Sequence, residues 1–200
     1  MPSLHDRVST ELLPYVNHPG QYIGGEINQL VSKGDWERAM VRVAVAFPDT
    51  YTIGISHLGC QIIYWLINHT PGCCAERVYC PWLDAEGVMR HKGIELFTWD
   101  TRQPVASADI LAVSLQYEMA FTSVLQILDL AKIPLRSADR DDEAQTEGEP
   151  EQTEPTKRPF RKGHGGGYRP WAALLARPFP VDGVWCGGGW EGGIIAKCLY

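Results

Sequence analysis

Seven residues lie at or just beyond the ends of the two most continuously apolar, β-branched runs of this 200-residue chain, Val41–Phe47 and Ile110–Ser114. Runs of this composition are typical of strands buried on both faces of a parallel sheet. In open α/β sheets, ligands bind at the carboxyl ends of the strands, so residues there form a candidate cofactor-binding set. That set is Asp49, Ser56, His57, Gly59, Ser114, Gln116 and Glu118.

The first group of candidates precedes an apolar stretch with helical character. Ser56 is the expected N-cap of a helix that begins near Leu58, and a nucleotide-like tail or a corrin edge could meet the free N–H groups there. Alternatively, His57 hydrogen-bonds locally in the first helical turn, and Asp49 caps the helix instead of meeting a ligand hydroxyl. The three candidates after the second run are either pocket residues or solvent-exposed strand ends.

Catalytic and metal-binding patterns are missing from the sequence. It has no Ser/His/Asp order, no H-E-x-x-H and no carboxylate pair, so we expect no catalytic centre in this chain and leave open whether the protein is an enzyme. The six cysteines fit neither paired C-x-x-C zinc motifs nor the C-x-x-x-C-x-x-C of an iron–sulfur loop. Cys73, Cys74 and Cys80 form the only cluster, and adjacent cysteines chelate one ion poorly. We therefore predict no metal ligands.

The elements that must position these residues alternate between strand and helix, which predicts an α/β fold with a doubly wound, mostly parallel sheet. Pro48 is expected to end the first strand, because proline lacks the N–H that a sheet needs. A short strand is expected at Val78–Cys80, and the alternating Ile94–Trp99 predicts a half-buried or edge strand. The expected helices are Leu58 to about His69, Ala85–Lys92 with Asp84 as N-cap and Gly93 at its end, and Met119–Ala131.

Composition divides the chain into four parts. Residues 1–37 are expected to form a helical and loop extension, and residues 38–136 the α/β domain. Residues 137–160 are acidic and poor in large apolar residues, which predicts a disordered linker. Residues 161–200 are poorly patterned and predict an irregular tail, in which Val181–Gly187 is expected to add one short strand.

Charge and hydropathy narrow the classes of partner. The net charge is −6, and residues 139–154 carry eight acidic residues and one Arg, so the remainder sums to about +1 and shows no footprint for nucleic acid. No run reaches the roughly 18 apolar residues of a membrane span, and the first residues lack the pattern of a secretion signal. We expect a cytoplasmic protein without membrane or nucleic-acid partners.

Four sequence blocks occur in an order that resembles the N-terminal region of the B12-binding-type radical SAM proteins. The likeness covers roughly residues 10–136, and its blocks are Tyr22–Asn28, Ala46–Gly59, Glu76–Trp82 and Asp109–Glu118. The resemblance implies a Rossmann-like, flavodoxin-like domain of the cobalamin-binding type with a corrinoid as ligand. It also implies a separate radical SAM domain as partner, which holds the [4Fe–4S] cluster and S-adenosylmethionine in the parent family.

The chain departs from that family pattern in three places. The D-x-H-x-x-G that supplies an axial histidine is absent around His57, and Gln116 replaces the leucine of an S-x-L element that begins at Ser114. After about residue 136, the chain matches the later glycine motifs of the family only weakly. This departure indicates a truncated, frameshifted or rearranged gene, or a divergent insertion. Two further hypotheses stay open: a ligand-free docking domain that positions a radical SAM partner, and a stand-alone flavodoxin-like enzyme or nucleotide binder.

Overall fold

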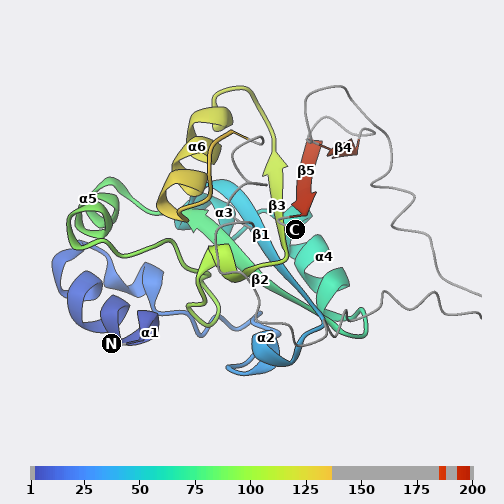
Figure 1. Cartoon of the computed structure of the whole chain (residues 1–200), viewed down its shortest axis with the longest axis horizontal. Helices are drawn as coiled ribbons and strands as arrows, with labels where there is room; N and C mark the ends of the chain where they lie inside the picture. Colours follow the sequence, from blue (N-terminus) through green and yellow to red (C-terminus); the bar gives the residue numbers. More distant parts are fainter. Residues whose placement is uncertain (1–2, 137–184, 188–192, 199–200) are drawn as a thin grey trace, which may run out of the picture.

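The structure is a computed structural model that describes residues 3–136, 185–187 and 193–198. Its centre is a five-stranded sheet in the order β2-β1-β3-β5-β4 (Figure 1). The strands are β1 (Val41–Thr50), β2 (Cys73–Cys80), β3 (Ile110–Leu115), β4 (Trp185–Gly187) and β5 (Gly193–Cys198). The principal helices are α3 (Tyr51–Gly54), α4 (Leu58–Asn68), α5 (Leu83–Lys92) and α6 (Ala120–Leu130).

The first three strands are parallel and confirm the expected α/β, Rossmann-like fold. β1 lies between β2 and β3, with Val43 opposite Ala75 on one side and Ile110 on the other. The two apolar runs are therefore adjacent, central and parallel, as their composition predicted. Most of β1 and β3 is buried, because helices cover the sheet on both faces. β5 adds to β3 in the antiparallel direction, and β4 pairs with β5.

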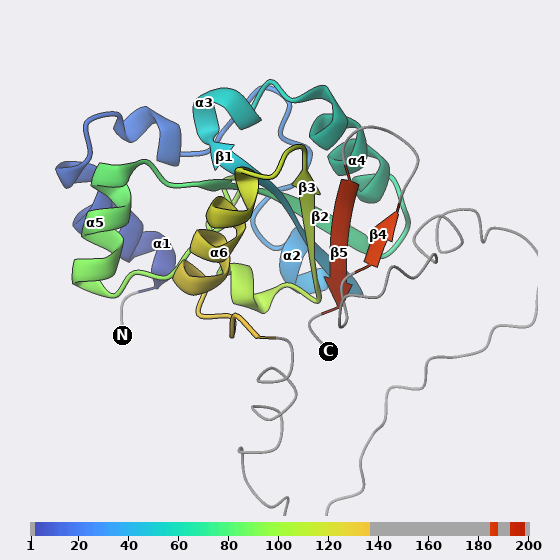
Figure 2. The same ribbon diagram turned by 90° about the horizontal axis from the view of Figure 1, so that it is seen from above.

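The helices α4 and α6 lie on opposite faces of the sheet (Figure 2). Arg77 of β2 packs its guanidinium over the ring of Tyr64 in α4, 4.6 Å from the ring centroid. Cys80, three residues further along the same strand, contacts the carbonyl of Ser123 in α6. Side chains three apart on a strand point to opposite faces, so these two contacts assign the helices to opposite layers.

The first turns of the N-terminal segment pack against α5, and its last helix contacts β2 (Figure 1). Short helical turns make up this segment: α1 (Leu4–Arg7), the π-turn η1 (Val8–Leu12), the 3₁₀ turns η2 (Leu13–Tyr15) and η3 (Pro19–Tyr22), and α2 (Asp35–Arg38). Ser3 and Asp6 form a capping box that begins α1. Arg7 donates to the last carbonyls of α5, at Lys92 (2.7 Å) and Gly93 (3.2 Å), and so joins the segment to the domain.

Several local predictions differ from the structure. Pro48 does not end β1, which continues to Thr50 with a register shift after Phe47 and leads directly into α3. The cap of α4 is His57 rather than Ser56. β2 begins at Cys73, five residues before the predicted strand, and α5 begins at Leu83, before the expected Asp84 cap.

The segment Ile94–Trp99 is not a strand. Only one isolated bridge, Phe97 to Pro104, pairs it with its return segment. The side chains of Leu96 and Phe97 are nevertheless fully buried, because the segment lies along the outer edge of β2. At that edge the Trp99 N–H donates a hydrogen bond to the Arg77 carbonyl (2.8 Å). It covers a sheet edge that would otherwise present free backbone groups.

The linker predicted at residues 137–160 lies outside the described residues, as does most of the predicted tail. Among the residues that are described, no helix has both the length and the apolar character needed to cross a bilayer.

Candidate functional site

The parallel pairing of β1 and β3 brings the ends of both apolar runs to one edge of the sheet. Asp49 near the end of β1 and Tyr117 just after β3 meet there, the Tyr117 hydroxyl donating to Asp49 Oδ2 at 3.3 Å. The other carboxylate oxygen, Oδ1, accepts from the Thr50 N–H at 2.7 Å. The negative charge of Asp49 raises the pKa of Tyr117, so this phenol stays protonated as a donor.

His57 is the N-cap of α4, and its ring packs against β1. Its Nδ1 accepts a hydrogen bond from the Cys60 N–H (3.2 Å), and its ring stacks on Phe47 of β1 with centroids 4.6 Å apart. A side chain at Gly59 would approach His57 Cε1 to 3.0 Å, so the glycine leaves room for this arrangement. In a neutral imidazole whose Nδ1 accepts, Nε2 carries the proton and has no lone pair for a metal.

The side chain of Ser114, in β3, lies beside Cys60 in the first turn of α4. It is buried, and its Oγ accepts from Gln116 Nε2 at 2.7 Å. Burial raises the pKa of the neighbouring Cys60 thiol, and hydrogen bonding with Ser114 opposes the rise. Ser114 and Gln116 therefore form a polar pair beside the capping histidine.

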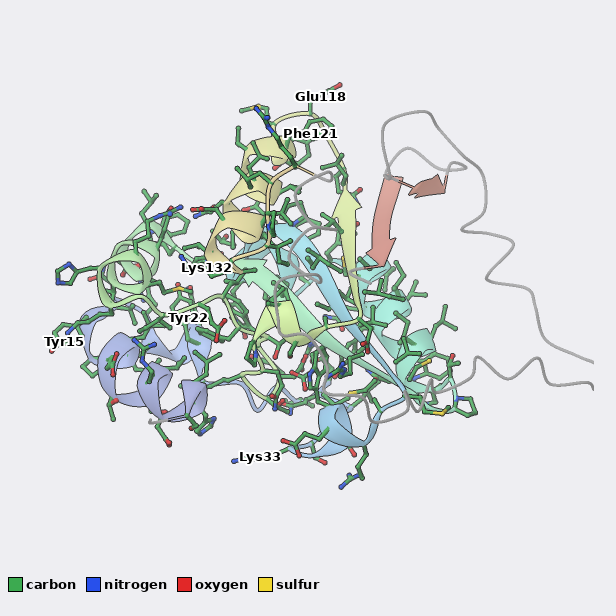
Figure 3. All side chains as sticks on the ribbon, in the orientation of Figure 1. Tyr15, Tyr22, Lys33, Glu118, Phe121 and Lys132 are labelled. Atoms are coloured by element: carbon green, nitrogen blue, oxygen red, sulfur yellow. The ribbon has the colours of Figure 1, made fainter. Side chains whose placement is uncertain are left out.

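Two candidates do not join this group. Ser56 is exposed and donates backwards to the Ile53 carbonyl at 3.2 Å, within its own turn. Glu118 is exposed at the start of α6, where its carbonyl accepts from the Phe121 N–H (Figure 3). The structure thus places Asp49, Ser114 and Gln116 at the carboxyl ends of β1 and β3, and His57 against Phe47 of β1 with Gly59 beside it.

Among the described residues, the side chains that could bind a metal ion do not cluster. No group of three or more His, Cys, Asp or Glu side chains is close enough there to hold an ion. Burial raises the pKa values of Cys74 and Cys80 to about 12, which disfavours the thiolate form that metals bind. A surface hollow of about 440 Å³ between α5 and α6 is lined by none of the seven candidates.

A buried ionic pair near this region was missed by sequence reasoning. Arg77 of β2 and Asp100 are 2% and 0% exposed at their side chains, with Arg77 Nη2 2.6 Å from Asp100 Oδ1. Asp100 also accepts from the Arg77 N–H (2.7 Å) and from the Tyr64 hydroxyl (3.4 Å). Burial lowers the pKa of Arg77, but the bonds and charge of Asp100 outweigh it and raise the pKa overall.

The Tyr22–Asn28 block lies across this ionic pair. Gly24 has φ +71°, and a Cβ there would meet the carbonyl oxygens of Trp99 (2.8 Å) and Asp100 (2.9 Å). Asn28 accepts from Arg77 Nη1 at 2.6 Å, so the block closes the network from outside. The sequence did contain a signal for this pair: Glu76 and Arg77 are charged residues inside an otherwise apolar strand. Charged side chains buried in such a strand need buried partners of their own.

The hydrogen-bond network of Arg77, Asp100 and Asn28 contains no reactive group. It does hold the Tyr22–Asn28 block close to the carboxyl ends of β1 and β3. In that block the Glu26 carboxylate accepts a hydrogen bond from Tyr51, the first residue of α3. Burial raises the pKa of Tyr51 to about 12, and the bond and charge of Glu26 add to the shift. The side chains of this block therefore fix the connection that leaves β1.

Residues 59–146 match the sequence model of a family described as "Radical SAM proteins, N-terminal". No curated protein and no solved structure gives a significant match to the chain. The matched region begins in the first turn of α4 and contains Ser114, Gln116 and Glu118, whereas Asp49 and His57 precede it. The match supports placing the chain in the radical SAM family.

Proposed function

We propose that the chain is the cobalamin-binding-type N-terminal module of a radical SAM protein and that a corrinoid binds at the shared edge of β1 and β3. One observation carries this proposal: the hydrogen bond from Tyr117 to Asp49 joins the carboxyl ends of the adjacent parallel strands β1 and β3, and Ser114 and Gln116 pair at the same end of β3. This is the edge where open α/β sheets bind cofactors. The radical SAM match, which covers β3 with Ser114 and Gln116 but not β1, supports it.

The polar side chains at the edge suit the amide-rich rim of a corrin. Asp49 supplies acceptor oxygens, Tyr117 a hydroxyl and Gln116 an amide, and all three are at least partly exposed. A bound cobalamin would supply methyl-transfer or radical chemistry at its cobalt. His57 is not an axial ligand in this proposal, because its Nδ1 is occupied by the helix cap and its proton therefore lies on Nε2.

The catalytic partner in this proposal is a radical SAM domain that holds the [4Fe–4S] cluster and S-adenosylmethionine. Such a cluster needs three thiolates on neighbouring positions, and the described cysteines are dispersed over α4 and β2. The module by itself therefore binds and positions but does not catalyse. Its four described cysteines are free thiols, which supports a reducing, cytoplasmic location.

The proposal is tested by titrating the purified chain with hydroxocobalamin and following the corrin absorbance. We expect saturable binding that Gln116→Ala weakens several-fold and that His57→Ala leaves spectrally unchanged. Gln126→Ala is the matched control, since it removes the same amide from α6, where it bonds Glu86 away from the edge. Loss of binding in both glutamine variants, or no binding by the wild type, would refute a corrinoid site here.

A ligand-free docking domain is the second candidate, and the engaged His57 favours it. In that case the wild type would not bind cobalamin at any concentration tested. The chain would still bind a separately purified radical SAM domain of the parent family. Cobalamin titration alone therefore distinguishes the two proposals, and this experiment requires no knowledge of the substrate.

A further inference from the structure

The helix α4 is apolar on both sides. Its inner side places Cys60 and Tyr64 in the core, as expected for a helix lying on a sheet. Its outer side also carries large apolar residues, and these are exposed: Leu58 (71%), Ile62 (50%), Trp65 (49%) and Leu66 (53%). An amphipathic surface helix would place polar residues there, so the outer side has the composition of a contact surface.

The outer residues follow the spacing of a helix–helix seam. Leu58, Ile62, Trp65 and His69 are separated by four, three and four residues, the alternation that keeps side chains facing a partner helix. The Trp65 ring stacks on His69 at 3.9 Å between centroids, which orders it before any contact forms. The face therefore fits an α-helix better than a flat or extended partner.

Further exposed apolar residues extend this face on one flank. Ile27 and Leu30 lie beside α4, because Asn28 donates to Gln61 (3.0 Å) and the Leu30 N–H donates to Tyr64 (2.9 Å). Ile53 of α3 is also exposed, directly before α4. We call the set of Ile27, Leu30, Ile53, Leu58, Ile62, Trp65 and Leu66 the α4 face.

The size of the α4 face suits a protein–protein interface. If a fully exposed apolar side chain offers roughly 100 Å², the exposed fractions of these seven side chains give roughly 430 Å² of apolar surface. A standard interface buries about 800 Å² per partner, of which about 57%, or roughly 450 Å², is apolar. The two areas agree.

We infer that the α4 face binds the same face of a second copy of this chain, with the two α4 helices packed antiparallel about a twofold axis. α4 has no charged residue from Leu58 to Asn68, so two copies meet there without bringing like charges together, although each chain carries a net charge of −6. A self-complementary seam needs a partner helix with the same spacing, and a second α4 supplies it. Leu58 of each copy then lies near His69 of the other.

The experiment is to measure the mass of the full chain in solution by light scattering and sedimentation between about 1 and 100 µM. We expect a dimer whose dissociation constant rises at least about 30-fold in Trp65→Asp, because the carboxylate loses its water in the interface. Phe121→Asp is the matched control: Phe121 is 52% exposed on α6, on the opposite face of the sheet, and should keep the dimer.

Every outcome decides the proposal. A monomeric wild type would overturn it and would mean that another part of the chain or another protein covers the α4 face. A dimer that survives Trp65→Asp, or that Phe121→Asp weakens equally, would also overturn it. If Trp65→Asp fails to fold by circular dichroism, Leu58→Asp at the most exposed position of the seam replaces it and is judged in the same way.

Discussion

Replacing Asp100 by Asn tests whether the buried ionic pair holds the domain together. The substitution keeps the size of the side chain and an acceptor oxygen for the Arg77 N–H, but it removes the negative charge that faces the Arg77 guanidinium. Arg77 is 2% exposed and cannot reach water, and the other side chain that accepts from its guanidinium is the neutral Asn28, through Oδ1. The variant therefore buries an uncompensated charge.

The expected loss follows from this burial. Removing one partner of a buried ion pair costs about 3–5 kcal/mol in the free energy of unfolding, because the partner's desolvation is no longer offset. For a domain of this size that corresponds to a fall in melting temperature of roughly 6–20 °C. Since whole domains are stable by only about 5–15 kcal/mol, the variant should unfold at markedly lower urea concentration.

Two companion variants separate the charge from other effects of the substitution. Asp129→Asn removes an exposed ion pair with Arg90 and should cost less than about 1 kcal/mol. The double variant Arg77→Met with Asp100→Asn removes both charges and should recover more than half of the loss. Chemical denaturation of all variants by urea measures these differences. A loss at Asp100 no larger than at Asp129, or no recovery in the double variant, would refute the reasoning.

Two further predictions concern the same region. Gly24→Ala should destabilise the fold by clearly more than Gly25→Ala: both glycines have positive φ, but only a Cβ at Gly24 meets backbone oxygens, and urea midpoints compare them. Burial raises the pKa of Glu76 above its usual 4.5, although bonds from Thr101 and Thr98 oppose the rise. The folded state thus holds the proton more tightly, and stability is lost as the pH rises from 4.5 through the raised pKa. Glu76→Gln should remove that loss in denaturation between pH 4 and 8, and an unchanged profile would contradict it.

The sequence by itself determined the layers of the fold and the edge where a site could form. Val41–Phe47 and Ile110–Ser114 are apolar over their whole length, and such strands are stable only when both faces are covered. That requirement placed them at the centre of a parallel sheet, and parallel neighbours necessarily share their carboxyl edge. The seven candidates followed from this geometry, and it also explains why Tyr117, just after β3, reaches Asp49 near the end of β1.

Local signals failed where a long-range contact outweighed them. Ser56 has a good capping side chain, yet His57 caps α4 because its ring is also held by stacking on Phe47, a contact that depends on β1. Ile94–Trp99 alternates like a strand, but it pairs with the edge of β2 through single contacts and not as a ladder. Propensity describes a residue's neighbours in sequence, whereas these outcomes depend on neighbours in space.

Only the tertiary structure decided what the charged residues do. Glu76 and Arg77 are consecutive, so they point to opposite faces of β2, and each is stable when buried only because a distant segment supplies its partners. The α4 face was equally hidden from periodicity, because an apolar helix looks the same whether its outer side meets protein or water. Pairing and exposure are properties of the folded arrangement, since both require knowing which surfaces remain after the chain has packed.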